Sequence, residues 1–156
     1  MQYKYYLHLF AGMAMLELGN LASSLAPFNV SAVSESLGAN SQESGLVVTL
    51  ELFFAAISSL FFGTVSYKGK ALAYCGSLIV ICSYFLCSIA SDVNQITFIK
   101  AFSGIGCGML IASGHSILAS SQDPNRSYAL FTLFASLTAA FLIYISSTWI
   151  EDGGHS

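Results

Sequence analysis

The chain has 156 residues, of which 55% are hydrophobic and only 8% are charged, and its mean hydropathy is +0.71. Soluble globular domains do not have this composition, so we expect an integral membrane protein. The net charge of −3 is small, and the sequence holds no basic run or basic–aromatic stripe, which argues against a nucleic-acid partner.

Five apolar stretches fill the chain almost from end to end. Each is about as long as the twenty residues with which a helix crosses roughly 30 Å of hydrocarbon. We therefore predict an all-α fold, an integral membrane helical bundle of five transmembrane helices in a single transmembrane domain over residues 1–156. The predicted helices cover approximately residues 7–30, 45–66, 71–91, 95–120 and 128–150. The first stretch is too long, and too polar at its centre, for a cleaved signal peptide.

The first predicted helix carries polar residues near its middle. Glu17, Asn20 and Ser24 recur at helical spacing and form one stripe with Pro27. An ionisable side chain at the bilayer centre costs about 2.5–3.5 kcal/mol, so Glu17 needs a partner or a water-filled cavity. We predict that the stripe either lines a cavity, where it contacts substrate or a proton, or forms a structural hydrogen bond to another helix.

Two residues of opposite charge fall in the second and fourth predicted helices. Glu51 and Lys100 both lie roughly 8–10 Å below the outer surface, at about 1.5 Å per residue. Their matching depth predicts an ion pair. Two alternatives remain open, because Lys100 can extend to the outer interface on its own and Glu51 can be a protonated, hydrogen-bonded acid.

The fourth predicted helix contains three closely spaced glycines, Gly104, Gly106 and Gly108. Gly104 and Gly108 form a GxxxG pattern, which allows two helix backbones to approach closely. We therefore predict that these glycines serve helix packing.

The cysteines also fall inside predicted helices, without the spacing of a zinc or redox site, and we predict that they pack as small buried residues. They are Cys75, Cys82, Cys87 and Cys107. The sequence offers no metal site, and it has no nucleophile–base pair of the kind that an intramembrane hydrolase needs. We therefore do not expect an enzyme.

The basic residues of the predicted loops all lie on one side if each stretch spans the membrane. This side holds Lys4, Lys68, Lys70 and Arg126. The charged residues of the opposite side are all acidic, namely Glu35, Glu43, Asp92, Glu151 and Asp152. Because positively charged loops stay in the cytoplasm, we predict a multi-pass protein of the cell (inner) membrane with a cytoplasmic N-terminus and an outer C-terminus.

Three short patterns resemble motifs of one transporter family. Residues 63–70 are similar to an inner loop of the form Gly-x-x-x-Asp-Arg-x-Gly-Arg, although Tyr67 stands at the aspartate position and one residue is missing. The glycine and basic positions of this loop are Gly63, Lys68, Gly69 and Lys70. Residues 100–108 resemble Arg-x-x-x-Gly-x-Gly-x-Gly with lysine for arginine, and residues 123–126 resemble a short inner turn, Asp-Pro-Asn-Arg.

In order and spacing, these patterns resemble the amino-terminal half of the major facilitator superfamily of secondary transporters. In that family two six-helix halves enclose a solute site at mid-membrane. The resemblance implies an incomplete half that ends after the fifth helix, with the third helix outside the central cavity and the other four around it. It also implies substrate or proton contact at Glu17, Asn20 and Ser24, support or coupling by Glu51 and Lys100, and gating by residues 63–70.

We therefore expect a secondary-transporter polypeptide whose full-length parent transports a small solute across the membrane. We expect this chain to be a fragment that is not active alone. Its expected partners are the lipid bilayer, an unidentified small solute and a complementary transporter half, and we expect no bound cofactor. The alternative is a non-transporting multi-span membrane protein that interacts with or regulates a partner.

Overall fold

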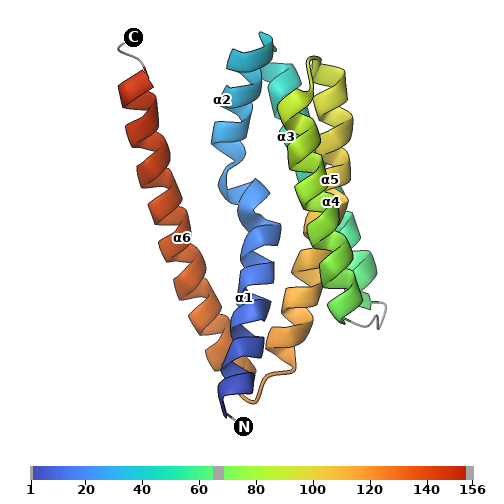
Figure 1. The fold of residues 1–156 in the computed structure, drawn as a ribbon, viewed down its shortest axis with the longest axis vertical. Helices are drawn as coiled ribbons and strands as arrows, with labels where there is room; N and C mark the ends of the chain where they lie inside the picture. The colour runs from blue at the N-terminus through green and yellow to red at the C-terminus, as the bar shows by residue number, and fades with distance from the viewer. Residues whose placement is uncertain (1, 65–68, 154–156) are drawn as a thin grey trace.

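The computed structural model describes residues 2–64 and 69–153, with side chains over residues 5–64 and 69–145 (Figure 1). Every element of this described part is an α-helix, so the predicted all-helical fold is confirmed. The helices are α1 (Gln2–Ser24), α2 (Ala26–Leu37), α3 (Ser41–Thr64), α4 (Gly69–Ile89), α5 (Val93–Ala119) and α6 (Pro124–Gly153).

Four single helices, α3 to α6, are long and apolar enough to cross a membrane, and α1 with α2 makes a fifth span if this bent pair is counted as one. These are the features of a multi-pass membrane protein. Among the predicted basic loop residues, the side chains of Lys4 and Lys68 lie outside the described part of the chain.

The predicted continuous helix over residues 7–30 is wrong, because α1 and α2 meet at an angle of 52° around Leu25. Pro27 explains the break. It has no N–H to donate to the carbonyl of Ser23, and its ring crowds that carbonyl, so the regular ladder of helix hydrogen bonds is interrupted. Helical structure then resumes, with the Asn29 N–H bonded to the Leu25 carbonyl at 2.9 Å.

The segment between the first two predicted helices, residues 31–44, is largely helical in the structure. Helix α2 continues through Leu37 and ends at Gly38, whose φ of 63° is left-handed and favours glycine. Helix α3 then starts at Ser41, because Asn40 and Glu43 form a reciprocal capping box. The Asn40 Oδ1 accepts from the Glu43 N–H at 2.9 Å, and the Glu43 carboxylate accepts from the Asn40 N–H at 3.0 Å.

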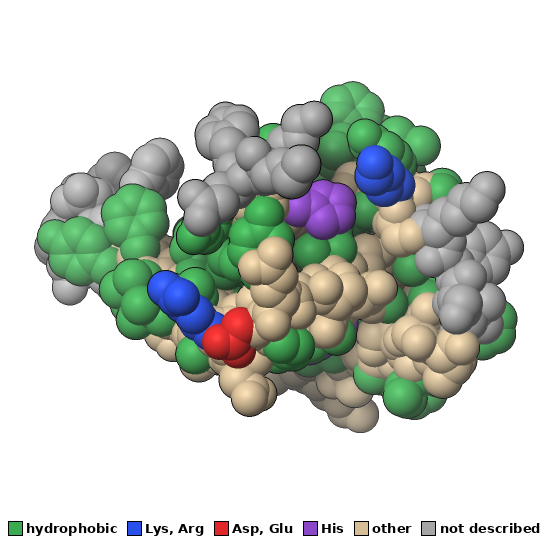
Figure 2. Space-filling model, turned by 90° about the horizontal axis from the view of Figure 1, so that it is seen from below, with side chains coloured by type: hydrophobic (Ala, Val, Ile, Leu, Met, Phe, Trp, Pro, Cys, Tyr) green, Lys and Arg blue, Asp and Glu red, His purple; other side chains and the backbone are tan. Residues whose placement is uncertain are grey.

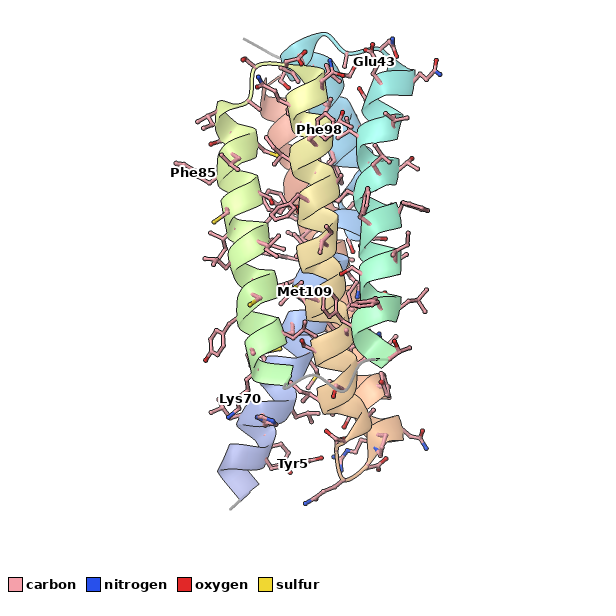
Figure 3. The ribbon with its side chains drawn as sticks, turned by 90° about the vertical axis from the view of Figure 1, so that its right-hand side faces the viewer. Tyr5, Glu43, Lys70, Phe85, Phe98 and Met109 are labelled. Atoms are coloured by element: carbon pink, nitrogen blue, oxygen red, sulfur yellow. The ribbon has the colours of Figure 1, made fainter. Side chains whose placement is uncertain are left out.

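Helix α5 is the centre of the bundle, and α1, α3 and α4 all pack on it (Figures 1 and 3). Glycines bring the backbones together. Gly104 and Gly108 lie against the α3 backbone near Ala55, and Gly106 lies against Gly76 of α4. Hence successive small residues of α5 serve two different helix contacts.

Helix α1 approaches α5 in the same way, through glycines that were not predicted as packing residues. A Cβ on Gly19 would lie 2.8 Å from the Cys107 carbonyl, and one on Gly114 would lie 2.8 Å from the Gly12 carbonyl. The spacing of Gly12 and Gly19, two turns apart on one helix face, was the available signal. Close backbone contact therefore continues along three sides of α5.

Helix α6 packs much less. It runs beside α1 near the N-terminal end of the bundle and diverges from α2 toward its other end (Figure 1). Ser127 is its one buried residue in the described part, and His115 Nδ1 lies 3.2 Å from Tyr128 Oη. Most of the described surface of α6 is therefore exposed.

The prediction that all four cysteines are buried is wrong. Cys107 is buried at the contact of α5 with α1 and α3, but Cys75 and Cys82 are exposed on α4. The reason is that α4 packs on the bundle with one face only, and in a membrane its other face can remain apolar and unburied.

Candidate functional site

The structure brings Glu51 of α3 and Lys100 of α5 together. Lys100 Nζ lies 3.2 Å from one Glu51 carboxylate oxygen and donates a hydrogen bond of 3.5 Å to the other. The Glu51 side chain is 0% exposed and the Lys100 side chain is 7% exposed. Lys100 thus ends at a carboxylate inside the bundle and does not extend to the outer surface.

The position of this ion pair follows from the packing of α5. Gly104 lies one turn after Lys100, and a Cβ at this position would collide with the backbone carbonyl of Glu51. The absence of a side chain at Gly104 lets the two backbones approach, which places the short Glu51 carboxylate within reach of the lysine. The glycine pattern and the ion pair are parts of the same contact.

A third residue, Tyr84 of α4, completes the environment of Lys100. The Lys100 Nζ lies 4.5 Å from the centroid of the Tyr84 ring, which is the geometry of a cation–π interaction. Tyr84 was not predicted from the sequence. It precedes the end of α4 by about one and a half turns, so its depth matches that of Glu51 and Lys100 and could have indicated the contact.

The ion pair can remain in hydrocarbon because its formal charges cancel. Removing two charges from water is costly, however, and an attraction between buried charges often only offsets that cost. A pair of this kind is therefore weak evidence for a gain in stability. It is better suited to fixing the position of α3 relative to α5. It can also change partners if a proton or a charged solute reaches it.

Glu17 of α1 has a different environment. The residue is only 6% exposed, and its carboxylate has no hydrogen bond or ion pair with any described residue. Asn20 donates a hydrogen bond of 2.9 Å to the Leu16 carbonyl of its own helix. The Ser24 hydroxyl makes no hydrogen bond within the described part. The described residues therefore do not show the predicted structural hydrogen bond from this stripe to another helix.

The polar stripe leads to the break between α1 and α2. Ser24 is the last residue of α1, and the break at Leu25 lies about two turns beyond Glu17. Broken helices in membrane proteins expose backbone groups that would otherwise be paired, and they are tolerated where they line a cavity or are buried in protein. Here a carboxylate, an amide, a hydroxyl and an interrupted backbone follow one another along one segment.

The described residues of the predicted gating loop lie at the ends of two helices. Gly63 lies in the last turn of α3 with open space around it, and Gly69 and Lys70 form the first turn of α4. Lys68 lies outside the described residues. Figure 3 places Lys70 at the same end of the bundle as Tyr5, far from Glu43.

Comparisons of the chain with protein-family models, with curated proteins and with solved structures found no match. Function therefore has to be inferred from the side chains and helices described above.

Proposed function

We propose that this chain is part of a secondary transporter of the major facilitator type, which moves a small solute across a membrane. The observation that carries the proposal is Glu17, an acidic residue that is only 6% exposed within a long apolar helix and whose carboxylate lacks a partner in the described part of the chain. A multi-span protein that only stabilises a neighbour has no use for such a group.

The comparison with Glu51 supports this assignment. Both acids lie on apolar helices, but Glu51 is neutralised by Lys100 whereas Glu17 is not. An ionisable group in a membrane span that lacks a counter-charge is expected to bind a proton or a cation during the transport cycle. A proton or the cationic group of a solute would satisfy Glu17, and the neighbouring Asn20 and Ser24 can donate hydrogen bonds to the same ligand.

The arrangement of the helices also supports a transporter. We count α1 and α2 as one bent span, which gives five spans. In the proposed transporter α4 would lie outside a central cavity, and the other four spans would border that cavity together with the complementary half. The exposed surface of α6 is then available to a complementary transporter half, and the surface of α4 to the lipid bilayer. The ion pair of Glu51 and Lys100 holds α3 to α5 and is the candidate coupling element.

In this proposal the N-terminus is cytoplasmic and the C-terminus lies outside the cell (inner) membrane. Lys70 and Asp92 flank α4 at opposite ends and are exposed. In a chain whose native cysteines are replaced by alanine, an impermeant thiol reagent added to intact cells should label Asp92→Cys and spare Lys70→Cys until the cells are opened. Labelling of both positions from outside would contradict the arrangement, and Glu43→Cys serves as a second outer marker.

Replacing Glu17 by glutamine tests the transport proposal. Purified chain is first screened by thermal unfolding against amino acids, sugars, organic acids and organic cations, and a stabilising solute is then titrated. We expect Glu17→Gln to weaken its binding at least about tenfold, because a hydrogen bond to a charged group contributes about 1.5–3 kcal/mol. Glu35→Gln is the matched control, since Glu35 is exposed on α2.

Equal solute binding by the two glutamine variants would remove Glu17 from the site. A chain that binds none of these solutes but copurifies with a membrane protein in fixed proportion would favour the interaction or regulatory function instead.

A further inference from the structure

A groove opens between α1 and α4 at the end of the bundle that carries the N-terminus. Both helices pack on α5, but they hardly touch each other, so α5 forms the floor of a cavity of about 470 Å³. Its polar lining residues are His8, Lys70, Tyr74, Ser77, Ser116 and Ser120. Figure 2 views this end of the bundle and shows histidine and basic side chains on its surface.

The groove is positively charged, and several of its polar groups have no partner among the described residues. Lys70 brings a full positive charge, and no acidic residue is among the lining residues. Within the described part of the chain, Lys70 has no ion pair, and the side chains of His8, Ser77 and Ser116 have no hydrogen-bond partner. An ammonium group beside hydroxyl and imidazole donors is a typical environment for a phosphate group.

The groove also has an apolar part. Ala11, Met15 and Ile117 line it together with the polar residues, and Met15 lies about 10 Å along α1 from His8. The outer surface of α4 next to the groove is apolar, with Tyr74 76% exposed and Leu78 64% exposed. A ligand in this position therefore meets donors at the end of the bundle and hydrocarbon toward its middle.

We infer that this groove binds an anionic phospholipid, with the headgroup phosphate at Lys70 and His8 and an acyl chain along Met15 and Ile117. Basic pockets between transmembrane helices recognise anionic headgroups in this way. A soluble phosphate would use the donors but not the apolar wall. The bound lipid would fill the space between α1 and α4, which share few direct contacts.

Native mass spectrometry of the full chain in a neutral detergent tests the inference with two lipid probes that have identical acyl chains. Phosphatidylglycerol should remain bound at concentrations at which phosphatidylcholine does not. Lys70→Gln should weaken phosphatidylglycerol binding about fivefold, the contribution of one basic residue near an anionic lipid. Arg126→Gln is the matched control, because Arg126 is exposed at the same end but does not line the groove.

A second variant, Ser116→Phe, fills the groove without changing any charge and should also reduce phosphatidylglycerol binding. Equal losses in Lys70→Gln and Arg126→Gln would show general attraction to a basic end and overturn the site. Equal retention of the two lipids by the unmodified chain would overturn it as well. Displacement of phosphatidylglycerol by millimolar inorganic phosphate would assign the groove to a soluble anion and contradict the lipid.

Discussion

Lys100→Met is expected to lower the free energy of unfolding by about 3–5 kcal/mol, because it leaves a buried carboxylate without its partner. Glu51 has no exposed surface and pairs with Lys100 alone among the described residues. Glu51→Gln should destabilise the chain less severely, since lysine has a longer and more flexible side chain that can move toward the surface. Denaturant titration of the purified chain in detergent micelles measures both effects.

The double variant decides whether the two residues act as a pair. Glu51→Gln combined with Lys100→Met removes both charges, so its loss of stability should be smaller than the sum of the two single losses. Lys70→Met, an exposed lysine on α4, should change stability by no more than about 0.5 kcal/mol. Additive losses in the double variant would mean that the charges contribute separately and that their contact has no energetic role.

The depth of this ion pair could be predicted from the sequence, but its full environment could not. Counting residues from predicted helix ends gives the height of a side chain in the membrane, and this height matched Glu51 with Lys100. Which face of α4 turns toward α5 depends on how the helices pack. Tyr84 was therefore missed, although it lies at the same height.

The break at Leu25 was missed for a different reason. Hydropathy averages over a whole window, and the apolar pattern continues through Pro27, so the pattern indicates one helix. Prolines are tolerated in membrane helices, and their effect on direction depends on which neighbours support each half. The capping box of Asn40 and Glu43, in contrast, is local and could have been recognised from the spacing of an amide and an acid.

The environment of Glu17 could be predicted only as two alternatives. Sequence spacing places it on one face with Asn20 and Ser24, but it does not show what that face meets. The described residues offer it no hydrogen bond, while its neighbours Leu16 and Gly19 pack closely against α5. The acid without a partner is the feature of this chain on which the proposed solute site rests.

Gly104→Ala should destabilise the bundle by about 1–3 kcal/mol, although alanine is the better helix former. The new methyl group would collide with the carbonyl of Glu51, and the neighbouring amide of Ala55 lies 3.1 Å from its position. These are backbone atoms, so they can yield only if α3 as a whole moves away from α5. That movement would also lengthen the contact between Glu51 and Lys100, so the loss should be coupled to the ion pair.

Gly45→Ala is the matched control, and the two substitutions should have opposite signs. Gly45 is a helical glycine of α3, and outside its own turn of helix no described atom lies within 4 Å of the position that a methyl group would take there. Alanine at this position should therefore stabilise the chain by about 0.5–1 kcal/mol. The same denaturant titration in micelles compares the two variants. If both substitutions stabilised the chain, α5 would not approach α3 at Gly104, and the glycines that place Lys100 beside Glu51 would lose their role.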